Sequence, residues 1–304
     1  MSTRLGVHVP IAGGLDKALG WAQRTGCTTM QIFSRSPRGG RSSPIDLAVA
    51  RAFTAGRLHL GIEPLAIHAP YIINLASPEP EKWRWFIQHY REEYQRAEVL
   101  SAQYLVTHVG SHRGEGEAAG MQRVSEAIAR TLDGASASVM ILLENTAGSG
   151  QGLGYDFDQL ATMRNRVKAK NRVGICLDTA HLFAAGYPIH TEEGLDEMVA
   201  SFDRILGLEH LKMIHLNDSK VPFQSRVDRH WHIGEGHIGL EAFRRIVNHP
   251  RLTEIPFILE TPKTTEREDQ RNLDAVRALI GGIAPRRARA GRSRRRPSRR
   301  SAIA

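Results

Sequence analysis

The sequence predicts an α/β protein, a (β/α)8 TIM barrel with a disordered basic C-terminal tail. Eight apolar runs have the length and aliphatic content of buried parallel strands. Segments of helical character lie between successive runs. The six runs from residue 64 onward each end on His, Asp or Glu, which a core rejects unless something at the strand end uses them. These observations favour parallel strands whose carboxyl ends face one shared polar site.

Strands and helices are expected to alternate along the chain. The expected strands are residues 4–8, 28–33, 64–68, 104–108, 139–144, 173–178, 212–215 and 256–260. The expected helices are residues 15–25, 47–60, 81–100, 119–132, 157–167, 192–206, 240–247 and 267–280. Asp156 and Thr191 are residue types that begin helices. This alternation matches a barrel. An open doubly wound sheet is the alternative, but it would gather its site at one switch point.

Composition divides the chain into a TIM-barrel domain, residues 1–283, and an Arg-rich tail, residues 284–304. The tail has nine Arg and no Lys, Asp or Glu, whereas the rest of the chain carries 32 basic and 32 acidic residues. Because it lacks apolar periodicity, we expect the tail to be disordered. It is either a solvated extension or a tether that adds salt-sensitive affinity for a polyanion.

Cysteine usage and hydropathy indicate the cellular setting. The two cysteines, Cys27 and Cys176, lie near or inside expected strands, which argues against a disulfide framework and fits a reducing compartment. No apolar stretch approaches the roughly 20 residues needed to cross a bilayer. We therefore expect a cytoplasmic protein with no membrane partner.

The residues at the strand ends predict a metal centre. In a barrel the six polar ends would surround one pit: His68, His108, Glu144, Asp178, His215 and Glu260. Two further groups add candidates, His181 three residues after Asp178 and the loop that contains Asp228, His230 and His232. Alternate residues of an extended loop point the same way, so spacing alone allows His232 in place of His230. Imidazole and carboxylate without thiolate suit Zn²⁺, with Mn²⁺ or Fe²⁺ next.

Several motifs resemble the endonuclease IV family over about residues 5–261. They are Gly6–Gly14 (GVHVPIAGG), His68 with Tyr71–Leu75 (YIINL), Leu143–Ala147 (LENTA), Leu177–His181 (LDTAH), His215–Ser219 (HLNDS) and Ser225–His230 (SRVDRH). That family comprises zinc-dependent apurinic/apyrimidinic (AP) endonucleases of base-excision repair on a xylose-isomerase-like TIM barrel. All nine of its metal positions are filled in this chain.

The resemblance implies a metal assignment and a reaction. It implies three zinc ions, with Mn²⁺ as an alternative at one site: the first on His68, His108 and Glu144, the second on Glu144, Asp178, His215 and Glu260, and the third on His181, Asp228 and His230. Glu144 and Glu260 would be catalytic. The implied phosphodiesterase reaction cleaves double-stranded DNA on the 5′ side of an abasic site, leaving a 3′-hydroxyl and a 5′-deoxyribose phosphate. The family also implies a monomer.

The resemblance further implies DNA contacts by Arg38, Tyr71, Ile72 and Arg226. An aromatic and an aliphatic wedge would replace stacking lost on nucleotide flipping, while Arg offsets phosphate charge. Packing of Tyr71 and Ile72 onto the barrel rim is the alternative. The chain departs from the usual pattern at Gly39-Gly40, where larger side chains are usual, at Val109, where Pro is usual, and at Gln224, where Gly is usual.

The same residues leave two other functions open. A single-metal sugar isomerase or epimerase of the xylose-isomerase-like barrels would need only Glu144, Asp178, His215 and Glu260, and would bind one metal per chain. A non-catalytic nucleic-acid binder would depend on the Arg-rich tail and not on Glu260.

Overall fold

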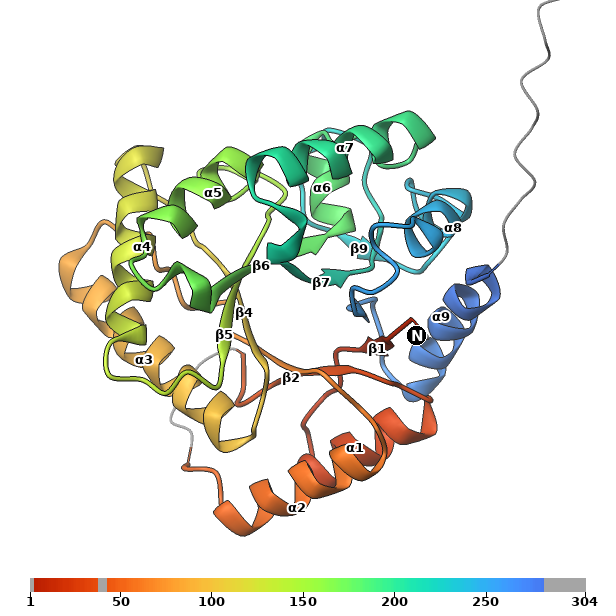
Figure 1. The fold of residues 1–304 in the computed structure, drawn as a ribbon, viewed down its shortest axis with the longest axis horizontal. Coiled ribbons are helices and arrows are strands. Elements are labelled where there is room, and N and C mark those ends of the chain that lie inside the picture. The colour runs from red at the N-terminus through yellow and green to blue at the C-terminus, as the bar shows by residue number, and fades with distance from the viewer. Residues whose placement is uncertain (1–2, 38–42, 282–304) are drawn as a thin grey trace, which may run out of the picture.

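The computed structural model describes residues 3–37 and 43–281, which form a closed parallel barrel (Figure 1). The strands are β1 (Leu5–Val7), β2 (Met30–Phe33), β3 (Leu65–His68), β4 (Tyr104–His108), β5 (Met140–Glu144), β6 (Val173–Asp178), β7 (Leu211–His215) and β10 (Phe257–Leu259). Their order is β1-β10-β7-β6-β5-β4-β3-β2, and a parallel bridge between His8 and Gln31 closes the ring. The predicted fold is confirmed. The Arg-rich tail lies outside the described residues.

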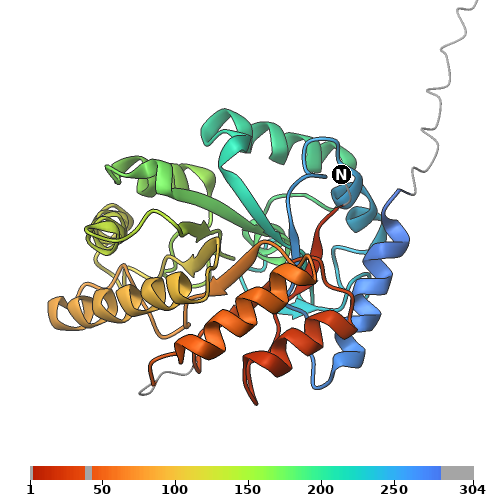
Figure 2. The same cartoon turned by 60° about the horizontal axis from the view of Figure 1, so that its bottom comes forward.

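Helices surround the barrel (Figures 1 and 2). They are α1 (Leu15–Arg24), α2 (Leu47–His59), α3 (Pro80–Val99), α4 (Glu117–Leu132), α5 (Phe157–Arg166), α6 (Thr179–Ala185), α7 (Glu192–Ile205), α8 (Leu240–Asn248) and α9 (Glu266–Leu279), with 3-10 turns at Lys170–Arg172 and Leu208–His210. Asp156 and Thr191 cap α5 and α7 with their side chains, as predicted. Across residues 3–37 and 43–281, no helix combines the length and apolar character required to span a bilayer.

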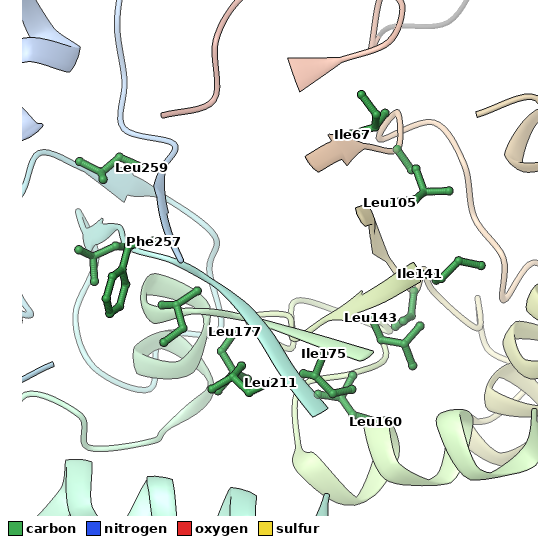
Figure 3. Close-up of a cluster of buried hydrophobic side chains, with 14 of the residues drawn as sticks. Ile67, Leu105, Ile141, Leu143, Leu160, Ile175, Leu177, Leu211, Phe257 and Leu259 are labelled. Carbon is green, nitrogen blue, oxygen red and sulfur yellow. The ribbon is translucent and has the colours of Figure 1, made fainter. Parts of the chain in front are cut away.

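The two faces of each strand have different partners. Outward-facing residues such as Ile67, Leu143 and Ile175 belong to the large core between strands and helices (Figure 3). A second cluster contains one residue from each of six strands, and the pairing register places them on the opposite face, inside the barrel: Ala66, Val106, Leu142, Cys176, Met213 and Ile258. Because side chains alternate along a strand, the residue two positions further on also points inward.

This alternation positions the predicted site. Two residues after each of the six interior apolar residues come His68, His108, Glu144, Asp178, His215 and Glu260. A layer of polar side chains therefore lies above an apolar layer, at the carboxyl ends of the strands. Both cysteines are buried and form no disulfide, as expected.

Two local elements were not predicted. Helix α6 begins directly after β6 with Asp178 as its N-cap, so strand and helix share one residue and no turn signal separates them. A two-residue antiparallel ribbon, β8 (Asp218–Ser219) with β9 (His230–Trp231), replaces an expected loop. These elements carry His181 and His230, so they matter for the site.

Candidate metal centre

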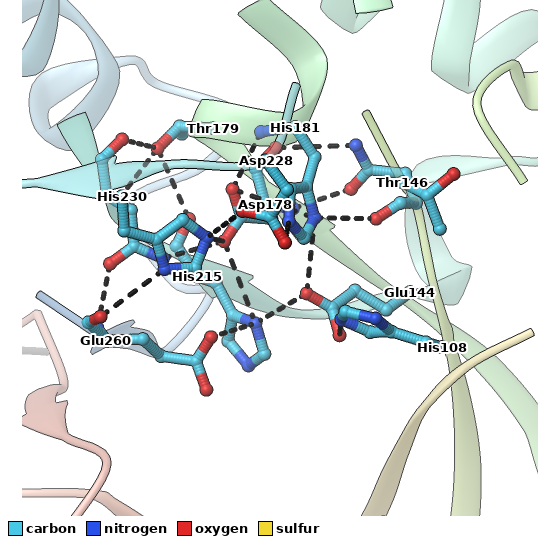
Figure 4. Close-up of polar contacts among 12 residues, drawn as sticks. His108, Glu144, Thr146, Asp178, Thr179, His181, His215, Asp228, His230 and Glu260 are labelled. Carbon is cyan, nitrogen blue, oxygen red and sulfur yellow. Dashed lines mark hydrogen bonds and ion pairs between the residues drawn. The ribbon is translucent and has the colours of Figure 1, made fainter. Parts of the chain in front are cut away.

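The structure brings all nine predicted metal ligands into one cluster at the barrel mouth, and Figure 4 labels all of them except His68. Three groups have ligand atoms within 4.8 Å of one another: His68, His108 and Glu144; Glu144, Asp178, His215 and Glu260; and Asp178, His181 and His230. Glu144 and Asp178 each belong to two groups. Neighbouring groups thus share a carboxylate, which is the arrangement expected of a multinuclear centre.

Glu144 lies at the middle of the cluster and is fully buried. Its Oε2 lies 3.1 Å from His68 Nε2 and 3.0 Å from His108 Nε2. Its Oε1 lies 3.0 Å from Nδ1 of His215, which is also 3.3 Å from Glu260 Oε2. One carboxylate therefore faces both the first and the second group.

Asp228 and His230 enter from the loop after β7. Asp228 Oδ2 lies 3.2 Å from His181 Nε2, and its Oδ1 lies 3.4 Å from His230 Nε2. The β8–β9 ribbon turns this loop back over the mouth. His232 instead has its Nδ1 3.1 Å from the Asn272 side-chain amide on α9, away from the cluster. Of the two histidines that the spacing allowed, His230 is therefore the one that faces the cluster.

Hydrogen bonds on the far side of three rings fix where their protons lie. The Nδ1 atoms are close to backbone carbonyl oxygens: His68 to Ala69 at 2.7 Å, His181 to Asn145 at 2.9 Å, and His230 to Glu260 at 3.3 Å. A carbonyl only accepts, so each Nδ1 carries a proton, and each Nε2 is left to bind a metal ion or, without metal, a second proton. Histidines that bind metals are usually oriented in this way.

The same geometry tests whether a cation fits. His181 Nε2 and His230 Nε2 are buried and receive no hydrogen bond from the residues that the structure describes, although both face the carboxylate of Asp228. Nitrogen lone pairs and carboxylate oxygens repel one another in a buried site unless a cation lies between them. The donor set therefore fits divalent metal ions.

The pKa shifts in the cluster also indicate that positive charge stabilises it. Burial acts to raise the pKa of Glu144, but His108 and His215 outweigh it and hold the pKa well below its ordinary value. The pKa of Glu260 is lowered in the same way, against burial, by His215 first. Burial disfavours the protonated form of His181, yet the surrounding carboxylates raise its pKa to about 10. Without metal, protons on histidine supply the missing charge.

Four residues that contact the proposed ligands were not predicted from the sequence. His8 directly follows β1 and Gln31 lies in β2, and both have a side-chain nitrogen within 3.1 Å of Glu260 Oε1. Asn217 donates to Asp178 Oδ2 at 2.6 Å and accepts from the Glu260 amide at 2.7 Å. Asn145 accepts from the Asp178 amide. His8 ends an apolar run, as the predicted ligands do, so that signal was present. Gln31 carries no such signal.

Exposed apolar side chains lie at the mouth above the cluster. Tyr71 is 63% exposed and Ile72 is 45% exposed. The Tyr71 ring is 5.4 Å from that of Phe33 and 5.8 Å from that of His68, so it stands beside the metal ligands. A cavity of about 530 Å³ is lined by both residues and by the ligands His108, His181 and Asp228. The exposed apolar side chains and the ligand cluster therefore face one cavity.

Arg226 lies on the same rim, and its guanidinium carbon is 5.3 Å from the centre of the Tyr155 ring. The Arg226 carbonyl accepts from Ser149 Oγ at 2.6 Å. Gln224, two residues earlier, has a φ of 61°, in the left-handed region that favours glycine. The fourth predicted DNA contact, Arg38, lies outside the described residues.

Comparisons with known proteins agree with this geometry. A sequence model of the xylose isomerase-like TIM barrel family matches residues 19–280. A Chloroflexus aurantiacus protein described as probable endonuclease 4 is 45% identical over 281 residues, which cover 92% of this chain and 99% of the relative. The crystal structure of endonuclease IV from Thermus thermophilus has a TM-score of 0.82 at 37% identity and covers 91% of this chain and 98% of that one. The chain belongs to the endonuclease IV family.

Membership of the endonuclease IV family confirms the resemblance predicted from the motifs. The fold alone would not have decided it. A D-tagatose 3-epimerase-like protein has a TM-score of 0.70 at 18% identity and covers 91% of this chain and 97% of its own. That likeness shows the shared barrel only, so the ligand set distinguishes the candidate functions.

Proposed function

We propose that this endonuclease IV family member is a DNA-repair phosphodiesterase. It hydrolyses the phosphodiester bond on the 5′ side of an AP site in double-stranded DNA and leaves a 3′-hydroxyl and a 5′-deoxyribose phosphate. Three zinc ions per chain are the cofactors, with Mn²⁺ as an alternative at one position. The observation that carries the proposal is the convergence of three ligand groups that share Glu144 and Asp178.

The nine ligands would hold the ions in the sets expected from the family. When bound, divalent ions supply positive charge that polarises a phosphate and lowers the pKa of water. Four carboxylates, those of Glu144, Asp178, Asp228 and Glu260, leave a residual positive charge against three divalent ions, which suits an anionic substrate. Nitrogen and oxygen donors without thiolate preserve this Lewis acidity. Burial raises the pKa of Cys176 to about 12, so this thiol keeps its proton.

The chain's own carboxylates would assist the attacking water. Glu144 and Glu260 have pKa values held well below the ordinary range, so both stay ionised at neutral pH. An ionised carboxylate orients water by accepting its hydrogens. Buried Glu144 is fixed in place by its contacts, which favours orientation over mobility.

Side chains at the mouth would recognise the damaged duplex. Tyr71 and Ile72 project exposed apolar surface next to the cavity and would fill the gap left by flipped nucleotides. A missing base lowers the energy needed for flipping, which favours abasic DNA over intact DNA. Arg226 would contact a phosphate at the rim, and Arg38 remains a predicted contact.

The second candidate function is a sugar isomerase or epimerase. Glu144, Asp178, His215 and Glu260 form one ligand group by themselves, and that group would be enough for a single-metal site. The observation against it is that His68, His108, His181, Asp228 and His230 also face the cluster. An isomerase that binds one metal has no use for them.

The decisive experiment uses a DNA duplex with one abasic-site analogue. Purified full-length protein should nick the abasic strand on the 5′ side, and prior chelation should abolish the nick until zinc is restored. Elemental analysis should give two or three metals per chain. One metal per chain, with turnover of a ketose and no nicking, would establish the epimerase instead. Sedimentation and cell fractionation test the predicted monomer and cytoplasmic location.

A further inference from the structure

Gln31 is a buried polar residue inside the barrel, and the metal-ligand assignment does not use it. It lies at the centre of β2 and is 0% exposed. Its register partner on β3 is Ala66, whose small side chain belongs to the apolar interior layer and leaves room beside it. A buried amide is stable only when its donors and acceptor are paired, so its partners show what it does.

The Gln31 amide contacts residues from three other strand ends. Its Nε2 is 2.5 Å from Glu260 Oε1 and 2.9 Å from His8 Nδ1. Its Oε1 is 2.9 Å from Nε2 of His215. Two of these partners, Glu260 and His215, are proposed ligands of the same ion, yet they lie 229 and 184 positions away in the sequence.

These contacts determine which way the amide points. A carboxylate only accepts, so Gln31 must present its NH₂ group to Glu260, and its carbonyl oxygen must face His215. A carbonyl only accepts as well, so His215 must donate from Nε2. His215 therefore carries a proton on Nε2, and Nδ1 is left with a lone pair for a metal ion, or with a second proton when no metal is bound. Rotating the amide by half a turn would place two acceptors against each other.

The His215 lone pair is directed at the second ligand group. Nδ1 lies 3.0 Å from Glu144 Oε1, 3.3 Å from Glu260 Oε2 and 4.0 Å from Asp178 Oδ2. Three carboxylates around one lone pair create a place for a cation. We propose that Gln31 is a positioning residue of this centre: its amide sets the His215 tautomer and the Glu260 orientation that the second metal requires. The proposal rests on the metal centre of the proposed function, and not on the DNA substrate.

His215 differs from three other ligand histidines in the source of its orientation. His68, His181 and His230 are oriented by backbone carbonyls, which no substitution removes. The far nitrogen of His215 depends on one side chain, that of Gln31. A single substitution can thus remove the constraint on the His215 tautomer and leave the orientation of His68, His181 and His230 unchanged.

The first test is direct observation of the tautomer. Full-length protein labelled with ¹⁵N-histidine is studied in its zinc-loaded form, and the His215 ring is assigned by comparison with His215→Asn. We expect the wild-type ring to carry its proton on Nε2 and to change to a mixture of tautomers in Gln31→Met. A wild-type His215 ring with its proton on Nδ1 overturns the proposal, whether or not any variant folds.

The second test is zinc affinity in competition with a chromophoric chelator. Gln31→Met keeps the side-chain length without donor or acceptor, and Gln31→Glu keeps the acceptor but places a carboxylate against Glu260. Both should weaken one zinc equilibrium by about 10- to 100-fold, the usual effect of losing an outer hydrogen-bond partner. The matched control is Gln103→Met. Gln103 pairs with the Leu65 amide at the opposite end of the barrel, and its loss should leave every zinc equilibrium unchanged.

The outcomes separate this inference from the proposed function. If folded Gln31→Met binds all zinc ions as wild type does, the positioning role is wrong even when abasic DNA is still cleaved. If wild-type protein fails to nick abasic DNA but loses one zinc equilibrium on Gln31 substitution, the proposed reaction is wrong and the positioning role stands.

Discussion

His68 and Tyr71 are three residues apart, and they belong to two regions of opposite character. His68 is 1% exposed, and both of its ring nitrogens lie close to protein atoms. Tyr71 is 63% exposed and shows much of its ring to solvent. At the strand end, side chains are held in place by contacts with one another and with backbone carbonyls. The rim instead presents apolar surface that a partner can cover. The proposed metal ligands lie in the layer at the strand ends, and the predicted DNA contacts lie in the loops above it.

Removing a carboxylate from the buried layer should have the largest effect. In Glu144→Gln the amide keeps the size of the side chain but loses the charge shared by two ligand groups. We expect cleavage of abasic DNA to fall by roughly 10²–10³-fold or more, with loss of bound zinc. Cleavage rate and metal content measure it. Glu126→Gln, an exposed carboxylate on α4, should change neither. A Glu144 variant with normal rate and full zinc would contradict the division into two regions.

Substitutions at the rim should weaken recognition and leave the metals in place. Tyr71→Ala removes an aromatic surface that would stack on a base, a contact usually worth about 1–3 kcal/mol. We expect KM for abasic duplex to rise, and zinc content and the pH profile to stay as in wild type. The control is Leu58→Ala, similarly exposed but near the C-terminal end of α2, at the opposite end of the barrel. Loss of zinc in Tyr71→Ala would show that the regions are coupled.

The pH dependence of thermal stability in the metal-free protein tests the charges in the buried layer. The pKa of His181 is raised from 6.5 to about 10, so the stability from its protonated form is complete below pH 6.5 and is lost as pH rises toward 10. We expect the midpoint of thermal unfolding of chelated protein to fall between pH 7 and 9. His181→Gln should reduce this fall. His249→Gln should not, because the pKa of His249 is lowered instead. An unchanged slope in His181→Gln would refute the assignment.

Arg226 should give the smallest effect, because it is an exposed charge on the rim. If it contacts one phosphate, Arg226→Ala should reduce the dependence of log K on log salt concentration by about 1. Titrations of abasic duplex at several salt concentrations measure this slope. Arg204→Ala, in the last turn of α7, is the control and should leave the slope unchanged. Equal slopes for wild type and Arg226→Ala would remove Arg226 from the interface.

Much of the site was predictable because strand ends leave a clear pattern. Glu144 and Asp178 each follow several apolar residues, and a core tolerates a carboxylate there only if it has a partner. The ribbon that carries His230 was less predictable, because its strands are two residues long and lack apolar alternation. Gln31 could not be found from the sequence, since glutamine inside a strand does not show which polar group will lie opposite it.

The sequence alone determined the barrel and the residues that end its strands, because apolar runs of strand length and the polar residues that stop them are local features. Only the tertiary structure decided how the ligands are oriented. The protons of His68 and His181 are set by carbonyl groups, which every residue has. That of His215 is set by an amide that barrel closure brings to it from β2. Such contacts depend on the shape of the closed ring, which no single segment of the chain contains.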